Sequence, residues 1–244
     1  MADAHTAERS QERDRAPTLG EQVYDRLRAD IINGTLAAGQ PLRLVALRAR
    51  YGAGFSPLRE ALSRLRSERL VMLEEQKGFR VAPVSIAEMW DAIETRVLIE
   101  SDALRRSIER GDEAWEVGIV ARFHALSSRA ARYAAQGVQL GPDELQELEA
   151  RHHAFHSALI SAAGSAWLTE FAEQLSVQTE RYRYPLLNGA TAGGQRDLHA
   201  EHQQLMELSL ARRADEAVAH LAEHYRRTGK LIEHHFAERA ERAA

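Results

Sequence analysis

The chain of 244 residues contains no cysteine, which excludes a disulfide framework and any thiolate metal site. It also lacks a run of eighteen uninterrupted apolar residues, and residues 1–17 are polar and charged, without the apolar core of a secretory signal. A metal site in this chain must therefore use histidine, aspartate or glutamate. We expect a cytoplasmic protein that has no membrane partner.

The length and the distribution of charge favour two domains. We expect residues 1–17 to form a disordered arm, residues 18–84 a first domain and residues 85–240 a second. The net charge of −4 divides into −1 for residues 1–17, +4 for residues 18–84 and −7 for residues 85–244. A basic segment in an otherwise acidic chain is typical of a nucleic-acid-binding domain.

The first domain shows three helical patterns followed by two strand patterns. Apolar residues spaced four apart predict a first helix that stops at Asn33-Gly34, and a second helix ends at Gly52. A third is predicted from Ser56 as its N-cap, with Pro57 at the first helical position, to about Glu68. Strands over residues 70–73 and 79–81 complete a winged helix-turn-helix.

After Ser85 the strand signals disappear, and amphipathic segments alternate with short breaks. Ser85 and Glu88 fit a capping box, and Pro142 fits the first turn of a later helix. We therefore predict a mainly α protein, in which the winged domain precedes an all-helical bundle of six to seven helices.

The third helix carries the DNA-reading candidates. If its leucines face inward, Ser56, Arg59 and Ser63 lie on the outer face near the helix N-terminus, where a recognition helix meets base edges and phosphates. Arg59 suits either a guanine or a phosphate, and a simply solvated arginine is the alternative. The candidates for contacts with the DNA backbone are Arg48, Arg50, Lys77 and Arg80.

Several segments of the first domain resemble the GntR family of regulators. They are Gly34-Thr35-Leu36, Gly39-Gln40-Pro41-Leu42, SPLREALSRL at residues 56–65, and Gly78-Phe79-Arg80-Val81. The resemblance covers most of residues 18–84 and implies a transcription regulator. One departure is Gly54-Phe55-Ser56 where the family often has Ser-Arg-Thr, so the arginine common at that place is absent and more of the specificity falls on Arg59.

Four histidines of the second domain have spacings that permit a shared metal ion. His152 and His156 are four residues apart on one predicted helix, so their side chains can converge. His202 and His224 lie on two later helices that an intervening turn can make antiparallel. Each of these histidines, taken alone, also fits a hydrogen-bonded core or surface residue.

The second domain resembles the FCD effector domain of the FadR-like branch of the GntR family. Its motifs are His152-His153-Ala154-Phe155-His156, then Glu201-His202, Asp215, Ala217, Leu221 and His224. The resemblance implies a metal held by His156, His202 and His224, with His152 where the family usually has an aspartate. An all-nitrogen site of this kind suits zinc, with nickel as the second choice.

The same resemblance implies a small carboxylate effector bound at the metal, with an arginine as its second partner. Arg96 matches an inward arginine of the family, although an ion pair with Glu100 is equally open, and Arg181 and Arg183 are further candidates. Within the branch, the chain most resembles regulators of dicarboxylate or glutarate-type catabolism.

These patterns lead to one main hypothesis, which is a homodimeric regulator that binds double-stranded operator DNA and responds to an effector. A metal-dependent hydrolase with Glu149 or Glu201 as general base is one alternative. A metal-independent DNA-binding protein, in which the helical domain only dimerises, is the other.

Overall fold

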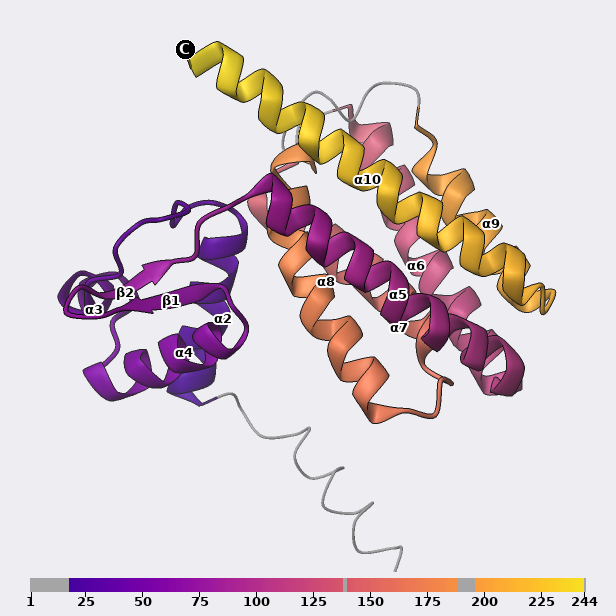
Figure 1. Cartoon of the computed structure of the whole chain (residues 1–244), viewed down its shortest axis with the longest axis horizontal. Helices are drawn as coiled ribbons and strands as arrows, with labels where there is room; N and C mark the ends of the chain where they lie inside the picture. Colours follow the sequence, from indigo (N-terminus) through magenta and orange to yellow (C-terminus); the bar gives the residue numbers. More distant parts are fainter. Residues whose placement is uncertain (1–17, 138–139, 188–195, 244) are drawn as a thin grey trace, which may run out of the picture. The chain divides into compact units, whose positions relative to one another are not determined.

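The computed structural model describes residues 18–137, 140–187 and 196–243 (Figure 1). The chain divides into two compact units, Met1–Pro83 and Val84–Ala244. The arm expected over residues 1–17 lies outside the described residues. Each unit is described below by itself.

The first unit consists of three helices and a two-stranded hairpin, as the sequence predicts. Its elements are α2 (Leu19–Ile32), α3 (Leu44–Tyr51), α4 (Phe55–Ser67), β1 (Val71–Glu74) and β2 (Gly78–Val81). The two strands are antiparallel, with Val71 opposite Val81 and Glu74 opposite Gly78. This order of elements is that of a winged helix-turn-helix, and the prediction for this unit is confirmed.

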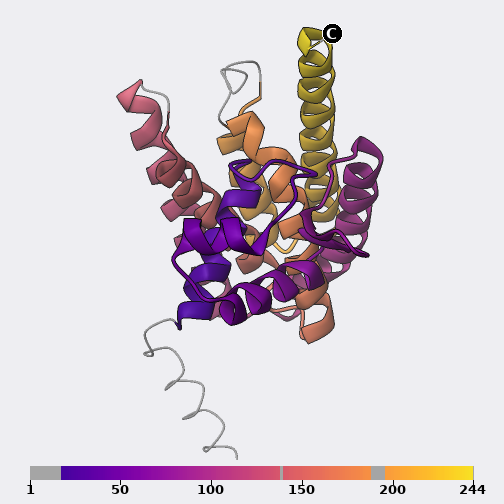
Figure 2. The ribbon, with the colours of Figure 1, turned by 90° about the vertical axis from the view of Figure 1, so that its left-hand side faces the viewer.

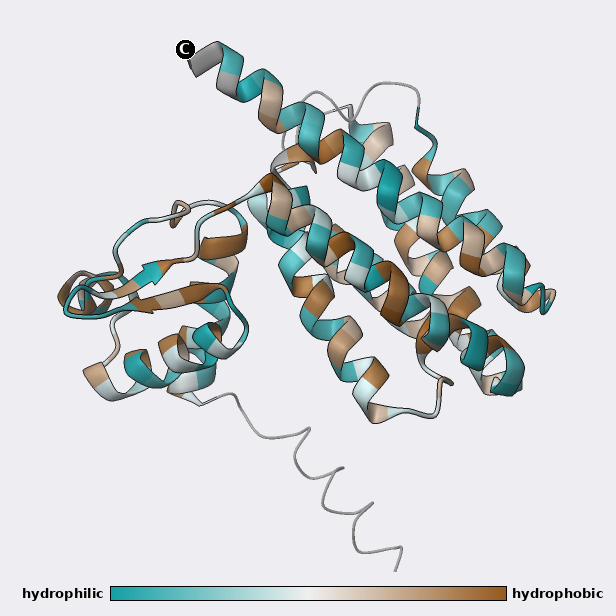
Figure 3. Cartoon of the chain, in the orientation of Figure 1, coloured by the Kyte–Doolittle hydropathy of each residue, from teal (hydrophilic) through white to brown (hydrophobic). Residues whose placement is uncertain are grey.

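The core of the first unit is made mostly of leucine. Leu27 of α2 and Leu58, Leu62 and Leu65 of α4 are completely buried, and Leu70 joins them just before β1. Burying one such side chain contributes about 1.5–3 kcal/mol. Figure 3 shows the corresponding hydrophobic residues along these elements. The leucines therefore fix α4 against α2 and leave its opposite face exposed.

The predicted N-cap and first helical residue of α4 are each wrong by two residues. The helix begins at Phe55, Gly54 is the N-cap, and no side chain caps it, so Ser56 is not the N-cap and Pro57 is not the first helical residue. The first turn of a helix has no intrahelical partners for its N–H groups, so a proline within that turn costs no hydrogen bond. The helix can therefore start ahead of Pro57.

The second unit contains six helices and no strand among its described residues, which confirms the predicted helical bundle. They are α5 (Ile86–Arg110), α6 (Glu113–Gln136), α7 (Pro142–Ile160), α8 (Ala166–Leu187), α9 (Leu198–Leu210) and α10 (Ala214–Ala243). The Ser85 hydroxyl accepts a hydrogen bond from the Glu88 N–H at 3.4 Å, which is one half of the expected capping box, while the Ser85 N–H donates to the Tyr182 hydroxyl. Pro142 opens α7, as expected. Among the described helices we find no candidate for a membrane-spanning segment.

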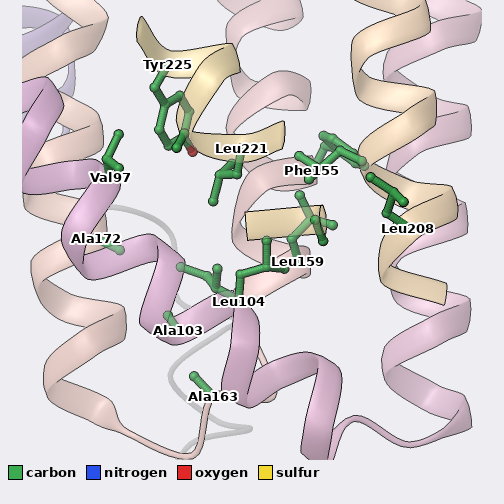
Figure 4. Close-up of a cluster of buried hydrophobic side chains, with 14 of the residues drawn as sticks. Val97, Ala103, Leu104, Phe155, Leu159, Ala163, Ala172, Leu208, Leu221 and Tyr225 are labelled. Carbon is green, nitrogen blue, oxygen red and sulfur yellow. The ribbon is translucent and has the colours of Figure 1, made fainter. Parts of the chain in front are cut away.

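Packing in the second unit centres on two sets of neighbouring helices. Helix α5 packs against α8 and α10, while α6 packs against α7 and α9, and Figures 1 and 2 show the long α10 beside α5. Figure 4 shows Leu104, Leu159 and Leu221 among the side chains that fill the space between them. Helices α7, α9 and α10 thereby present one face each to a common interior.

Candidate metal centre and DNA-binding surface

The four predicted histidines meet at one point inside the second unit. Each offers a ring nitrogen, and these four nitrogens all lie within 4.8 Å of one another. His152 and His156 come from successive turns of α7, because residues four apart share a helix face, and His202 and His224 come from α9 and α10. Three of the four are buried, and His152 keeps some exposure because it lines a cavity.

Two of these imidazoles have a buried ring nitrogen that forms no hydrogen bond within the described structure. Nε2 of His156 and Nε2 of His202 are buried and have no hydrogen-bond partner among the described residues. An unsatisfied buried polar atom costs about 1–3 kcal/mol, so such atoms are rare in folded proteins. Four converging nitrogens of this kind could hold a divalent metal ion.

The protonation state of the cluster also suits a metal. Burial lowers the pKa of His152, His156 and His202 well below the usual value, and the neighbouring positive groups lower it further. Burial also lowers the pKa of His224, to about 4, although its hydrogen bond to Glu201 opposes this change. At neutral pH the four imidazoles are therefore uncharged, which is the form that binds metal ions.

Glu201 orients one of the histidines. Its carboxylate lies 2.8 Å from Nδ1 of His224, which leaves Nε2 of that ring for the cluster. The same carboxylate accepts a hydrogen bond of 2.6 Å from Arg196, which holds Glu201 ionised and lowers its pKa against the effect of burial. Carboxylates bonded to the outer nitrogen of a ligating histidine fix its ring orientation and raise its basicity.

A second buried chain of contacts orients His156. The Tyr225 hydroxyl donates to Glu100 at 2.5 Å, and it lies 3.1 Å from Nδ1 of His156. Because the single hydroxyl proton points to Glu100, Nδ1 of His156 acts as the donor to Tyr225 and Nε2 presents its lone pair to the cluster. Arg96 completes the chain, since its guanidinium donates to Glu100 at 2.5 Å and to Thr179 at 2.9 Å.

A cavity of about 410 Å³ adjoins the four-histidine cluster. Residues of α6, α7, α8, α9 and α10 line it, together with Arg196, which precedes α9. Arg183 also lines it, forms an ion pair with Glu149, and keeps a buried Nε without a hydrogen-bond partner among the described residues. The cavity therefore combines three imidazoles of the cluster with two guanidinium groups.

The three arginines predicted as effector ligands occupy different surroundings. Arg183 lines the cavity, whereas Arg96 is held in the ion pair with Glu100, and Arg181 is buried beside the ring of Tyr182. The sequence reasoning missed Arg196, which stands outside any periodic pattern. Its only signal is its position just before Asp197, the N-cap of α9, and five residues before Glu201.

The predicted DNA-reading residues of α4 share one exposed face. Ser56, Arg59 and Ser63 are all exposed, opposite the buried leucines, and Arg59 makes no ion pair with any described residue. Phe55 is also exposed at the start of the helix, with the Arg48 guanidinium 5.3 Å from its ring centre. This face can present polar and apolar groups to a DNA groove.

The remaining basic candidates of the first unit differ in the ion pairs and hydrogen bonds that they form. Arg50 forms an ion pair with Asp30 at 2.9 Å, and Lys77 lies 3.6 Å from Glu74. Arg80 lies 3.0 Å from Glu74 and donates to the carbonyl of Gly39 at 2.7 Å. The half-buried Arg80 is thus also part of the support of the wing.

Comparison with known proteins identifies both units. The model of "Bacterial regulatory proteins, gntR family" matches residues 19–81, and that of the "FCD domain" matches residues 91–227. The chain is 39% identical to the uncharacterized HTH-type transcriptional regulator BphR of Paraburkholderia xenovorans (strain LB400), over 85% of this chain and 82% of that protein. It is 37% identical to the HTH-type transcriptional repressor GlaR of Escherichia coli (strain K12), over 78% and 84%.

A solved structure supports the fold. The structure described as E. coli McbR/YncC covers 91% of this chain and 100% of its own, with a TM-score of 0.73 at 20% identity. The family is one of transcription regulators, so the hydrolase alternative is wrong, and its two candidate bases, Glu149 and Glu201, are engaged in ion pairs. The chain belongs to the GntR family of bacterial regulatory proteins and carries an FCD domain.

Proposed function

We propose that the chain is a homodimeric regulator that binds operator DNA in the cytoplasm and senses a small carboxylate through a divalent metal ion. In this proposal residues 18–84 read the DNA and residues 85–240 bind the effector and the second copy. One observation carries the sensor part, namely the partnerless Nε2 atoms of His156 and His202 in a histidine cluster that adjoins a cavity lined by His202, Arg183 and Arg196.

The proposed metal ligands are His152, His156, His202 and His224. Four neutral imidazoles favour zinc first and nickel second, because both ions accept nitrogen ligands of this kind. The bound ion would supply a positive charge and a coordination position for an anion. The hydrogen bonds that His224 and His156 donate to Glu201 and Tyr225 support this assignment, because they leave the Nε2 atoms of both rings for the cluster.

The proposed carboxylate partners are the arginines of the cavity wall. A guanidinium binds a carboxylate through parallel N–H donors, and Arg183 has a buried Nε that no described group accepts from. Arg96 and Arg181 do not line this cavity, so we assign Arg96 to positioning His156 through Glu100 and Tyr225. Effector binding must differ between two arrangements of the protein if it is to change DNA affinity.

Dimer formation and repression are the remaining parts of the proposal. Trp167 of α8 is 68% exposed and lies against the exposed Phe171, with 5.8 Å between ring centres. Paired exposed aromatic rings favour a protein interface, and a two-fold dimer matches an inverted-repeat operator. The relatives GlaR and RspR are both named as transcriptional repressors, which favours repression here.

The test is to measure the affinity of the purified chain for its own upstream DNA, with and without zinc and a panel of small carboxylates. We expect stoichiometric zinc, tight DNA binding, and release of the DNA by at least one acid. The double variant His156→Ala/His202→Ala should lose zinc and the response while keeping DNA affinity. Arg59→Ala should lose DNA affinity while still binding zinc.

Two results would refute parts of the proposal. Protein purified without chelator or nickel resin that contains no metal, and takes up none on addition, would favour the metal-independent alternative. Zinc-loaded protein whose DNA affinity does not change with any acid would remove the sensor.

A further inference from the structure

One residue on the DNA-reading face of α4 differs in chemistry from its neighbours. Phe55, Arg59 and Ser63 are spaced four residues apart, so their side chains form one row along the helix. All three side chains are exposed. Phe55 is the first residue of α4 and is 42% exposed. The row therefore begins with an aromatic ring and continues with a guanidinium group and a hydroxyl group.

The exposure of Phe55 is not shared by the other aromatic residues described in the first unit. Tyr24 and Tyr51 are buried, and Phe79 is half-buried. An aromatic ring that stays in water forgoes the stabilisation that burial provides. Contact with another apolar group on DNA binding would supply that stabilisation to Phe55.

The groups around Phe55 favour DNA as the partner of its ring. The Arg48 guanidinium of α3 lies 5.3 Å from the ring centre, as in a cation–π interaction. Arg48 is exposed and, like Arg59, forms no ion pair with any residue that the structure describes. Two guanidinium groups without a carboxylate partner give this face a positive charge, which suits the phosphates of a nucleic acid.

The chemistry of the ring determines which base it can recognise. In the major groove, guanine presents acceptors, cytosine a donor, and adenine one of each, whereas thymine presents an acceptor and the C5 methyl group. A phenylalanine side chain neither donates nor accepts a hydrogen bond. The thymine methyl group is therefore the one group on a base edge that the ring of Phe55 can contact favourably.

We propose that Phe55 is a specificity-determining residue whose ring contacts the C5 methyl group of a thymine in each half of the operator. This inference rests on the proposed function, in which residues 18–84 read the DNA. Where the family often has an arginine, which suits guanine, this chain has an aromatic ring, which suits thymine. Specificity is thus divided between Phe55 and Arg59.

The test begins with the sites that the full chain selects from a pool of random duplexes. Each thymine of a selected site is then replaced in turn by deoxyuridine, which removes only the C5 methyl group. Fluorescence anisotropy at one fixed salt concentration measures the affinity. We expect one sensitive thymine in each half-site, with a loss of about three- to fourfold per methyl group and about tenfold when both half-sites are changed.

Variants at Phe55 show whether its ring causes this sensitivity. Phe55→Ala should bind the thymine and deoxyuridine duplexes equally, because the apolar contact is absent. Phe55→Leu should keep part of the preference, since leucine also presents an apolar surface, and Phe55→Arg should select guanine at that position. Val45→Ala is the matched control, because Val45 is 74% exposed on the neighbouring α3, and it should keep the full preference.

The outcomes separate this inference from the proposed function. The inference would be overturned by specific binding without a sensitive thymine, by Phe55→Ala with the same sensitivity as the unaltered chain, or by Phe55→Arg that still selects thymine. Each of these results would leave the DNA-reading function standing. A full chain that prefers no sequence over unrelated duplex DNA would overturn the DNA-reading function and the inference together.

Discussion

The two units bury different kinds of side chain. In the first unit the buried side chains are leucines and other apolar residues, and the polar candidates lie on the surface. In the second unit twelve polar or charged residues are buried, and every such residue in the described ranges belongs to it. They include Arg96, Glu100, Glu149, Glu201 and three histidines of the cluster.

This difference shows where each unit carries its function. A leucine core stabilises a fixed shape, which a DNA reader needs because its contacts are made by exposed side chains. Buried polar groups destabilise a fold unless each has a partner, so they are retained where they bind something. The interior of the second unit therefore has the composition that the proposed binding site requires, and that of the first has the composition of a scaffold.

The largest expected effect is on the leucine core. Leu62→Ala should reduce the free energy of unfolding of the first unit by about 2–5 kcal/mol, because it leaves a cavity at a fully buried position. DNA binding should fail while zinc uptake persists, as measured by thermal unfolding, DNA titration and elemental analysis. Val45→Ala, at a position 74% exposed, is the control and should change neither the free energy of unfolding nor DNA binding. An equal loss of zinc would contradict the separation of the units.

Zinc should stabilise the second unit alone. At a free zinc concentration one hundred times the Kd, the stabilisation is about 2.7 kcal/mol, and it requires an intact site. Differential scanning calorimetry should show one transition moving to higher temperature on addition of zinc. His202→Ala should abolish this rise in transition temperature. A rise that persists in the variant would show that the ion binds elsewhere.

Removal of one hydroxyl should lower the zinc affinity of the histidine cluster by less than the loss of a histidine does. Tyr225→Phe deletes the group between Glu100 and His156 without changing any histidine. Loss of such a partner lowers metal affinity about 10- to 100-fold. Competition with a chromogenic zinc chelator measures the change. Tyr133→Phe, which removes a hydroxyl bonded to Glu147 at the surface, should leave zinc affinity as it is.

The smallest effect concerns acid stability at the surface of the helical unit. Hydrogen bonds from Arg151, Tyr133 and Arg129 lower the pKa of Glu147 to about 2, compared with about 4.3 in an unfolded chain. The stabilisation is therefore complete above about pH 4.3 and is lost as the pH falls toward 2. Urea titrations between pH 6 and 2 should show a shallower loss for Glu147→Gln, and identical slopes would rule out this contribution.

Local patterns in the sequence predicted more of the fold than of the site. The spacing of apolar residues located the three helices of the first unit, because each helix repeats its own periodicity, and amphipathic segments between breaks predicted six to seven helices for the second. The start of α4 was misplaced because Pro57 fits more than one position in a first turn. Four histidines could be selected from eleven only by combining their spacing with the family motif.

The contacts around the histidines were not predictable from local pattern. Tyr225 and Glu100 are 125 positions apart, and they meet only because α10 packs on α5. Arg196 reaches His224 across 28 positions for the same kind of reason. Such partners depend on how helices pack, which the periodicity of a single helix does not record.

Under the proposed function, Glu201 takes part in both metal binding and anion binding. It shares its charge between His224 in the cluster and Arg196 at the cavity wall. An anion that draws Arg196 toward itself leaves more of the Glu201 charge for His224 and makes that imidazole a stronger electron donor. Coupling of this kind is reciprocal, so a metal ion at the cluster raises affinity for the anion by the same factor. Under the proposed function, the Glu201 carboxylate would thus couple the binding of the metal ion to the binding of the anion.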